Sequence, residues 1–515
     1  MRPIIQLFAK LLSLEARRFH QALKDPQAAQ AKVQREIFQR LVASEYGRSL
    51  GMRSLEDWQK IPIVNYGDLE SWIERQKQSK TALLTSEPIL FYEKTSGSRG
   101  PAKWIPYTRS LRRSFSQMFC IWAHDLISNG PKFSTGQVYF CVSPQLTQPT
   151  QTDTEVQVGL ADDAEYLDGW LQWLLRPFLV APADLNHLRD PEAFKEQLCL
   201  ALLQSETLEI VSVWSPSFLT VHLDYIQQHR HKLCEQLRDR LPAKRLALIS
   251  DPSTTWTQIW PHLKLISCWD SINAADQAQV LRSHFPSVMV QGKGLLATEA
   301  PMTVPLIAAH GSVPLLNEVF FEFEDSTGKI YLLHELKPAT EYSIILSQKG
   351  GLYRYRMGNR VRMTHTYLNT PCLEFLGRDQ MTSDLVGEKL HAAFVAQALD
   401  RLDLGSTTFR TLVPVTQPQP HYVLLLDQAD RQQEAIAQEL DAALCESPHY
   451  EHARLLGQLA PVQVLVSPEV LKLMLQQKWQ AGQKWGDIKH ELLATKPIET
   501  LQFFDFSSGC FGRVG

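Results

Sequence analysis

The chain has 515 residues, 44% of them hydrophobic and 21% charged, and its formal net charge is −3. This ordinary globular composition can bury a large core, and the length predicts about three domain-sized units. The charge gives no electrostatic reason to expect a nucleic-acid partner, and eight scattered cysteines without a CxxC pair argue against a disulfide framework or a zinc site and indicate a cytoplasmic protein.

The first 25 residues form an amphipathic segment, MRPIIQLFAKLLSLEARRFHQALKD. Lys10 interrupts its apolar run and no small-residue cleavage site follows, which argues against a signal peptide. We expect a helix that packs on the body of the protein, and the alternative is a helix that lies on a membrane surface. No stretch reaches the ~18 consecutive apolar residues that a membrane span needs.

Helical periodicity dominates residues 1–80, in which apolar residues recur at intervals of three and four until Pro62. The spacing of apolar residues changes at EPILFYEKTSGS, which predicts a short strand at 89–92 and then a Ser/Gly loop. Helices and short buried strands then alternate to about residue 290, which predicts α/β layers with a parallel sheet. The expected helices are 110–130, 190–205 and one opened by Ser215-Pro216, and the expected strands are 137–144, 207–214 and 245–250.

Strand patterns dominate residues 312–378 and predict an antiparallel sheet or a small barrel. The expected strands are 319–325, 329–336, 341–348, 351–358 and 359–365. After Arg378 the pattern changes to that of a compact α+β unit. Its expected helices are 390–402 and 431–447, and its expected strands are 409–415 and 421–427. The fold class is therefore α/β, with a large N-terminal domain (1–378) of layered α/β sheets plus a small β-barrel, and a smaller mobile α+β domain (379–515) after a hinge near Asp379.

The run TSGSRGPAK, residues 95–103, combines hydroxyls, glycines and cationic side chains. The glycines let backbone N–H groups point into one concavity, the hydroxyls donate to phosphate oxygens, and Arg99 and Lys103 supply charge. It is not a Walker A loop, because the Gly-Lys-Ser/Thr ending is absent. By itself the run predicts either a phosphate loop or an ordinary solvated turn between a strand and a helix.

Two later runs carry further candidates. Thr298 and Glu299 follow a strand-like segment, where a hydroxyl and a carboxylate suit a phosphate oxygen and the Mg²⁺ bound to it. The alternative for this pair is a helix N-cap, which the pair alone favours. Basic and aromatic residues alternate from Tyr353 to Arg356, so one strand face is cationic or aromatic, unless it is an exposed face with solvated arginines.

The order of these runs resembles that of the acyl-adenylate-forming superfamily: a Ser/Thr/Gly loop near residue 100, a Thr-Glu near 300, a Tyr-Arg-x-Gly-Asp-like turn near 358 and a Gly-Arg near 378. More narrowly, GLYRYRMGN…NTPCLEFLGR…LVGEKL is similar to the auxin-responsive acyl acid amido synthetases, the Gretchen Hagen family of plants and bacteria. ASEYGRSLG…DWQKIPIVNYGDLESWIER and WPHLKLISCW fit the same family, as a bacterial-type member. The resemblance spans about residues 35–400.

The resemblance implies a role for each matching residue. The ATP phosphates would be held by Thr95, Ser96, Gly97, Ser98, Arg99, Gly100 and Lys103. Thr298 would contact the α-phosphate, and Glu299 the Mg²⁺. The ribose would be bound by Asn359, where the family has aspartate, with help from Arg378. Alternatively, Asn359 only tolerates the positive φ of a Gly-Asn turn while Arg378 holds the ribose.

A lysine of the C-terminal domain completes the implied site. In the family it precedes a Pro-Arg, and Lys496 in ATKPIET matches it without the arginine, with Lys484 and Lys489 as rivals. Two further positions depart from the family. Leu295 and Leu296 stand where an aromatic usually precedes the Thr-Glu pair, and residues 270–275 read DSINAA where glycines are expected.

The implied protein is a ligase that uses ATP and Mg²⁺. It would activate a carboxylic acid as an acyl-adenylate and transfer the acyl group to an amine, usually an amino acid in this family, to form an amide. Two alternatives stay open: a ligase that passes the acyl group to a thiol such as coenzyme A, and a non-catalytic descendant that binds an acid or a nucleotide.

Overall fold

The structure is a computed structural model of the chain. It describes residues 2–79, 83–94, 103–141, 167–180, 185, 188, 190–378, 382–386, 388–416, 419–455, 458–480, 490–495, 504–505 and 510–511. Contacts divide the chain into two compact units. Unit 1 comprises Met1–Ser271 and Leu281–Gly377, and unit 2 comprises Ile272–Val280 and Arg378–Gly515. That the C-terminal part acts as a mobile lid, with a hinge near Asp379, stays a prediction, and Asp379 itself lies outside the described residues.

The first part of unit 1 is helical, as its periodicity predicts. Its elements are α1 (Arg2–Lys24), α2 (Pro26–Ala43), α3 (Glu45–Ser49), the 3₁₀ helix η1 (Leu55–Lys60) and α4 (Tyr66–Gln78). Side-chain caps set the starts of two helices: Asp25 accepts a hydrogen bond from the Ala28 N–H at 3.0 Å, and Asn65 and Asp68 form a capping box before α4.

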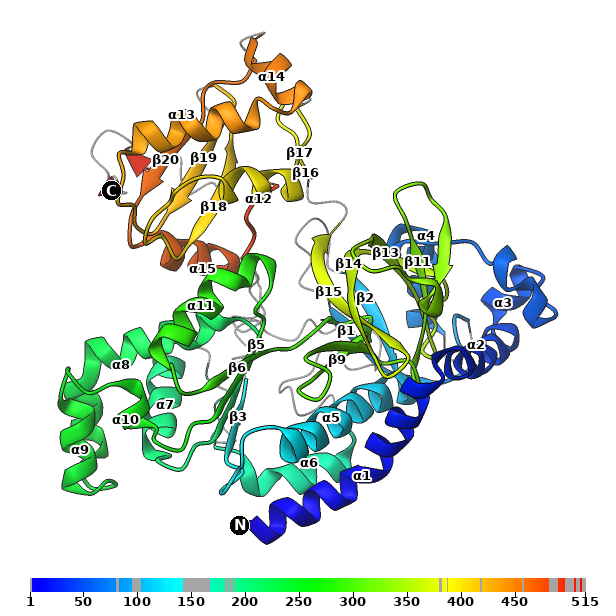
Figure 1. The fold of residues 1–515 in the computed structure, drawn as a ribbon, viewed down its shortest axis with the longest axis horizontal. Coiled ribbons are helices and arrows are strands. Elements are labelled where there is room, and N and C mark those ends of the chain that lie inside the picture. The colour runs from blue at the N-terminus through cyan, green and yellow to red at the C-terminus, as the bar shows by residue number, and fades with distance from the viewer. Residues whose placement is uncertain are drawn as a thin grey trace. The chain divides into compact units, whose positions relative to one another are not determined.

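A β-hairpin follows these helices. β1 (Ile89–Lys94) pairs antiparallel with β2 (Trp104–Thr108), so the expected strand at 89–92 is confirmed. The segment between them therefore joins two strands and not a strand and a helix, and the choice between a phosphate loop and an ordinary solvated turn stays a prediction. α5 (Arg109–Asn129) begins directly after β2 and shares an apolar cluster with α1, which confirms that the amphipathic first helix packs on the body of the protein (Figure 1).

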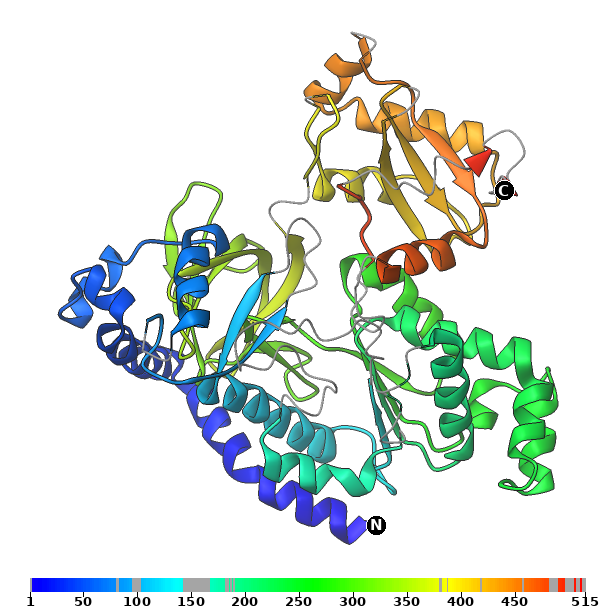
Figure 2. The ribbon, with the colours of Figure 1, turned by 180° about the vertical axis from the view of Figure 1, so that it is seen from behind.

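The expected parallel sheet is present in unit 1. Its four strands are paired in the order β3 (Val138–Phe140), β4 (Ile210–Ser212), β5 (Leu265–Cys268) and β6 (Met289–Gly292), all parallel. The helical elements between β3 and β6 are α6 (Gly169–Leu175), η3 (Arg176–Phe178), α7 (Pro191–Gln204), α8 (Pro216–Leu237), α9 (Ala243–Ser250), α10 (Trp256–Ile259), η5 (Ile272–Ala274) and α11 (Ala275–His284). In the front and back views, α7 lies beside this sheet (Figures 1 and 2).

The expected strand at 245–250 is wrong, because this segment is the helix α9. Arg245 and Ile249 are both buried and lie one helical turn apart, which puts them on one helix face. The Arg245 guanidinium donates hydrogen bonds to the carbonyls of Ile259 and Leu203. The partners of Arg245 lie on other helices, so nothing in the local sequence indicates that this arginine is buried. The short apolar run therefore looked like a strand.

Residues 296–378 form a further set of β-sheets. Short pairs are made by β7 (Leu296–Ala297) with β8 (Ala300–Pro301) and by β9 (Thr303–Leu306) with β10 (Gly311–Pro314). The main sheet has the order β12 (Ile330–Leu332), β11 (Val319–Glu324), β13 (Glu341–Gln348), β14 (Tyr355–Tyr367) and β15 (Thr370–Arg378), with the short helix η6 (Leu333–Glu335) after β12. No pairing of described residues joins β12 to β15, so these five strands form an open sheet. The separate strands expected at 351–358 and 359–365 are one strand, β14, that runs through an irregularity.

Unit 2 is the expected α+β unit. Its three-stranded sheet has the order β18 (Arg410–Val415), β19 (His421–Leu426) and β20 (Gln463–Val466), antiparallel in the first pair and parallel in the second. The other described elements are β16 (Thr382–Ser383), β17 (Leu390–His391), α12 (Ala392–Asp400), α13 (Gln433–Leu444), α14 (Pro448–Leu455), α15 (Val470–Gln480), β21 (Phe504–Asp505) and β22 (Cys510–Phe511). No helix in the described part of the chain has both the length and the hydrophobicity that crossing a bilayer requires. Seven cysteines of the described residues are free thiols.

Candidate active site

The β1–β2 hairpin carries the predicted phosphate loop. Residues Thr95, Ser96, Gly97, Ser98, Arg99 and Gly100 lie outside the described residues. Lys103 is described at the base of the loop, half-buried, with its ammonium 5.6 Å from the centre of the Tyr66 ring. The Tyr66 hydroxyl accepts a hydrogen bond from the Trp104 N–H at 2.8 Å. The loop end of the hairpin is therefore fixed to α4, which sets the position of Lys103.

The Thr298-Glu299 pair forms the turn between β7 and β8. No helix begins there, so the helix N-cap alternative is wrong. The hydroxyl of Tyr107, on β2, donates a hydrogen bond to the Thr298 carbonyl at 2.8 Å. The structure therefore brings together the hairpin that carries the predicted loop and the predicted Thr-Glu turn, although 191 residues separate the two bonded residues.

The side chains around this turn are buried, and two of them are carboxylates. Tyr107 is fully buried and stacks on Phe91 with 4.7 Å between ring centres. Glu299 is buried, and so is Glu93 on the same hairpin. Burial, together with the charges of Glu93 and Glu299, raises the pKa of Tyr107 well above its ordinary value. The hydroxyl therefore stays protonated and remains a donor to the turn.

The alternating run at 353–356 is a packing feature. Arg354 is buried and its guanidinium donates to both carboxylate oxygens of Glu322, at 2.9 and 3.0 Å. Arg356 is half-exposed and pairs with Glu324 at 2.7 Å. Tyr353 and Tyr355 are each 1% exposed. The alternative of an exposed face with solvated arginines is wrong for Arg354, and the two arginines of this run, Arg354 and Arg356, neutralise carboxylates of β11.

Asn359 occupies an irregularity within β14. Ser343 pairs with Arg360 and Ile345 with Arg356, so three residues of β14 stand opposite one residue of β13. The positive φ of +74° belongs to Gly358 and not to Asn359. The alternative that Asn359 serves only to tolerate such a φ is therefore wrong.

The Asn359 side chain is also short of a hydrogen-bond partner. Asn359 is 3% exposed, and its Oδ1 accepts no hydrogen bond from the residues that the structure describes. A buried acceptor without a donor costs free energy, roughly 1–3 kcal/mol, unless something else satisfies it. A hydroxyl of a bound ligand is the kind of donor that this oxygen fits.

The remaining predicted residues belong to the C-terminal part. Arg378 ends β15, and nothing of its side chain is described. Lys496, Lys484 and Lys489 lie outside the described residues. The chain just before Lys496 is held at the edge of β18, because Leu412 exchanges two backbone hydrogen bonds of 2.8 Å with the flanks of Leu493.

Two buried residues near the candidate site and one buried residue of unit 2 were missed by sequence reasoning. Tyr107 and Glu93 sit on either side of the predicted loop, in runs whose consecutive residues are all buried, so no alternation of polar and apolar residues marked them. Glu388, within LVGEKL, is fully buried and accepts hydrogen bonds from the N–H groups of Leu385 and Val386 and from the Tyr422 hydroxyl. These bonds fix the backbone of Leu385 and Val386 within unit 2.

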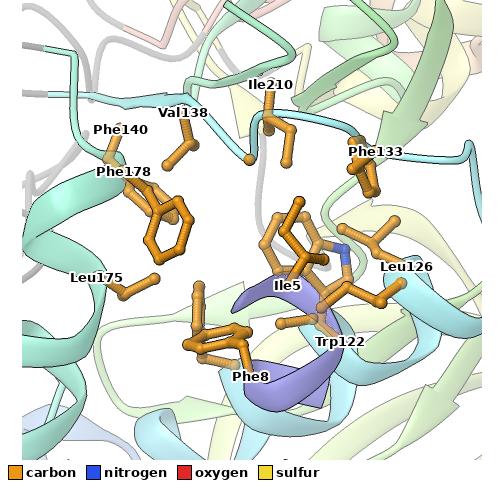
Figure 3. A pocket seen from close by; sticks show the side chains of 14 residues that line it. Ile5, Phe8, Trp122, Leu126, Phe133, Val138, Phe140, Leu175, Phe178 and Ile210 are labelled. Carbon is orange, nitrogen blue, oxygen red and sulfur yellow. The ribbon is translucent and has the colours of Figure 1, made fainter. Parts of the chain in front are cut away.

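An apolar cavity lies apart from these residues. It contains roughly 580 Å³ of empty space, its open mouth included. Figure 3 shows that side chains such as Ile5, Phe8, Trp122, Leu175 and Phe178 point toward it. None of the predicted site residues lines it, so it is separate from the candidate site.

Comparison with known proteins assigns most of the chain to one family. The models of the GH3 family N-terminal, central and C-terminal domains match residues 15–249, 312–378 and 388–498. Indole-3-acetic acid-amido synthetase GH3.15 of Arabidopsis thaliana is 24% identical over 77% of this chain and 76% of its own length. Jasmonoyl--L-amino acid synthetase JAR6 of Nicotiana attenuata is 21% identical over 79% of this chain and 80% of its own.

A solved structure shares the fold. AtGH3.15 acyl acid amido synthetase in complex with 2,4-DB superposes with a TM-score of 0.78, at 19% identity, over 94% of each chain. The mixed α/β fold class is thereby confirmed. Because the N-terminal, central and C-terminal domain models match most of the sequence, in that order along the chain, the chain belongs to the GH3 family.

Proposed function

We propose that the protein is an acyl acid amido synthetase. It uses ATP to convert a carboxylic acid to an acyl-adenylate and then joins the acyl group to an amine, most readily an amino acid, with release of AMP. The observation that carries the proposal is the Tyr107–Thr298 hydrogen bond, which joins the hairpin of the predicted phosphate loop to the Thr-Glu turn. Family membership and the names of the two relatives, an amido synthetase and an amino acid synthetase, support it.

Each step places a demand on the residues. A carboxylate is a poor acylating agent until one of its oxygens becomes a good leaving group, so the acid attacks the α-phosphorus of ATP and pyrophosphate departs. Negative charge then grows on the phosphates. Lys103 and the backbone of the 95–100 loop would neutralise it. Asn359, whose buried oxygen lacks a donor, would accept a hydrogen bond from a ribose hydroxyl, and Arg378 would assist.

The described residues fit Mg²⁺ as an accompanying ion. Mg²⁺ is usually held by one or two carboxylates together with substrate phosphates and water. Glu299 offers one buried carboxylate on the turn whose Thr298 would face the α-phosphate. No group of three metal-ligating side chains occurs among the described residues, so the phosphates would have to complete the coordination. When bound, Mg²⁺ would supply charge neutralisation on the phosphates.

The C-terminal domain would act as a lid. Closure would exclude water from the reactive adenylate and bring Lys496 to the phosphates. Lys496→Ala should then slow adenylation more than Lys484→Ala or Lys489→Ala. If either rival variant abolishes adenylation while Lys496→Ala does not, Lys496 is the wrong lysine. A cytoplasmic location suits the consumption of ATP and the free cysteines of the described residues.

A screen of carboxylic acids for ATP–pyrophosphate exchange tests the function. We expect exchange with at least one acid, and amide products by mass spectrometry when amino acids are added. A thioester formed with coenzyme A in place of an amide would favour the thiol ligase. No exchange with any acid, together with no binding of ATP by calorimetry, would favour a non-catalytic binding protein.

A further inference from the structure

Two neighbouring helices of unit 1 each have one apolar face inside the protein and another outside. Phe8 and Leu12 of α1 and Leu171 and Leu175 of α6 share one buried cluster on α5. The two helices therefore lie side by side over α5, as Figures 1 and 2 show. Burial of these inner residues explains why both helices pack on the protein, but it does not explain the apolar residues on their outer faces.

The outer faces carry large exposed hydrophobic side chains. On α1 these are Ile4, Leu7, Leu11 and Leu14, which are 50–58% exposed and follow one another at three- and four-residue steps. Such spacing places them in one stripe. On α6, Trp170 is 50% and Trp173 is 75% exposed. These six residues, named here the α1–α6 patch, are six of the ten large hydrophobic side chains found exposed among the described residues.

Such a group of exposed hydrophobic side chains is unusual for a surface that faces only water. Single exposed hydrophobic residues are common and need no explanation, but a contiguous patch marks an interaction site. The other four are spread singly over the rest of the described chain, at Leu90, Met289, Leu368 and Leu455. The patch is also separate from the candidate active site, because none of the predicted site residues belongs to α1 or α6.

The charge of α1 indicates what the patch contacts. Residues 2–24 contain five lysines and arginines and one acid, Glu15, which gives a net charge of 5 − 1 = +4, whereas the whole chain has −3. Glu15 is already paired with Arg18 at 3.0 Å. Lys10, Arg17 and Lys24 are exposed. An apolar stripe bordered by cations is therefore presented on an otherwise slightly acidic protein.

We propose that the α1–α6 patch docks the protein on an anionic lipid surface. Amphipathic helices with leucine or tryptophan on one face and Lys/Arg on the other lie in the membrane interface, where tryptophan is favoured and each nearby cation adds attraction to acidic lipids. A second copy of the chain fits less well, because pairing two copies of α1 would bring two +4 segments together. The proposal adds a location to the protein and does not depend on the proposed reaction.

Vesicle co-sedimentation of the full chain tests the proposal. We expect binding to vesicles of phosphatidylcholine mixed with phosphatidylglycerol, and much less to phosphatidylcholine alone. The double variant Leu7→Glu/Leu11→Glu should bind the acidic vesicles at least ~10-fold more weakly. Lys10→Glu/Arg17→Glu should also weaken binding and reduce its dependence on salt. The tryptophan fluorescence of the wild type should shift to shorter wavelength on binding, and because the chain has twelve tryptophans, the part due to Trp173 is the shift that Trp173→Phe loses.

Matched controls separate the patch from general effects. Leu455→Glu changes a leucine that is 79% exposed on α14 of unit 2, and it should bind vesicles like the wild type. Circular dichroism and thermal denaturation should show that the α1 variants fold. The proposal is overturned if wild type does not bind acidic vesicles, or if Leu455→Glu loses as much binding as Leu7→Glu/Leu11→Glu. It is also overturned if light scattering shows a dimer that Leu7→Glu/Leu11→Glu dissociates, since the patch would then join two copies.

Discussion

The hydroxyl of Tyr107 donates a 2.8 Å hydrogen bond to the main-chain carbonyl of Thr298. This bond links a hairpin strand to a turn that lies far along the chain, and it lies within a buried part of the protein. It gives the phosphate-loop hairpin and the Thr-Glu turn a common support. Because Tyr107 contacts the turn through the backbone carbonyl of Thr298, we expect it to act as a positioning residue.

Tyr107→Phe should therefore slow adenylation while the protein stays folded. A buried hydrogen bond of this kind contributes about 1–1.5 kcal/mol, so kcat for ATP–pyrophosphate exchange should fall roughly 5–10-fold. KM for ATP should change less, because the loop that would bind the phosphates is untouched. As a control, Tyr342→Phe removes a hydroxyl that accepts from the Lys337 N–H at 3.2 Å, away from the turn. Equal losses in both variants would mean that Tyr107 has only a structural role.

Lys103→Ala and Glu299→Ala should each slow adenylation at least ~10-fold, since a hydrogen bond to a charged group is worth roughly 1.5–3 kcal/mol. The reason is their predicted contact with the phosphates, directly for Lys103 and through Mg²⁺ for Glu299. Lys329→Ala is the matched control, because Lys329 also lies over a tyrosine ring, at 4.7 Å from Tyr331, but outside the site. Exchange at the wild-type rate in either site variant would remove that residue from the site.

Asn359→Asp should bind ATP more tightly than the wild type, by on the order of 1 kcal/mol. A carboxylate can accept hydrogen bonds from both ribose hydroxyls, whereas the amide has one acceptor oxygen and no charge. The free variant should be less stable, because the new carboxylate would be buried without a donor. Calorimetry with ATP and with its 2′,3′-dideoxy analogue checks this. An unchanged ATP affinity, or an equal gain for the analogue, would mean that Asn359 does not bind the ribose.

Arg354→Ala should destabilise unit 1 strongly. Arg354 and Glu322 are 4% and 1% exposed, so removing the guanidinium leaves a buried, uncompensated carboxylate, at a cost of roughly 3–5 kcal/mol. Chemical denaturation should show this loss. Glu322→Gln combined with Arg354→Met should recover part of it, because both charges are then absent. Arg362→Ala, which breaks the exposed pair with Glu374, should cost ~1 kcal/mol or less. Equal losses in the two single variants would contradict the buried-pair argument.

Glu209 should make the stability of unit 1 depend on pH in acid. Burial raises the pKa of Glu209, but hydrogen bonds from Lys264 and from the N–H groups of Gly136, Ser134 and Thr135 outweigh it and lower the pKa below its usual range. The ionised carboxylate therefore stabilises the fold. Its contribution is complete above the unfolded pKa of about 4.3 and is lost as the pH falls through the lower, folded pKa.

The test compares Glu209→Gln with the wild type across this pH range. The variant should be less stable at neutral pH, and the difference in the free energy of unfolding should shrink as the pH falls below about 4.3. Glu374→Gln serves as an exposed control and should show little change at any pH. A difference for Glu209→Gln that is the same at pH 7 and in acid would show that ionisation of Glu209 does not matter.

The sequence by itself determined the features that depend on neighbours along the chain. The spacing of apolar residues predicted the N-terminal helices. Alternation of helices and strands indicated the parallel sheet, and the change of pattern after Arg378 indicated a second unit. The order of the motifs led to the family without any knowledge of how they meet in space.

Only the tertiary structure decided which of these segments meet and which side chains they bury. Residues 245–250 have a short apolar run that suits a strand or a helix, and distant carbonyls that accept from Arg245 favour the helix. Arg354 is buried because Glu322 of another strand neutralises it, which no local pattern signals. Asn359 is buried by the irregular pairing of β14 with β13. The Tyr107–Thr298 bond joins segments 191 residues apart, and such contacts arise only when the chain has packed.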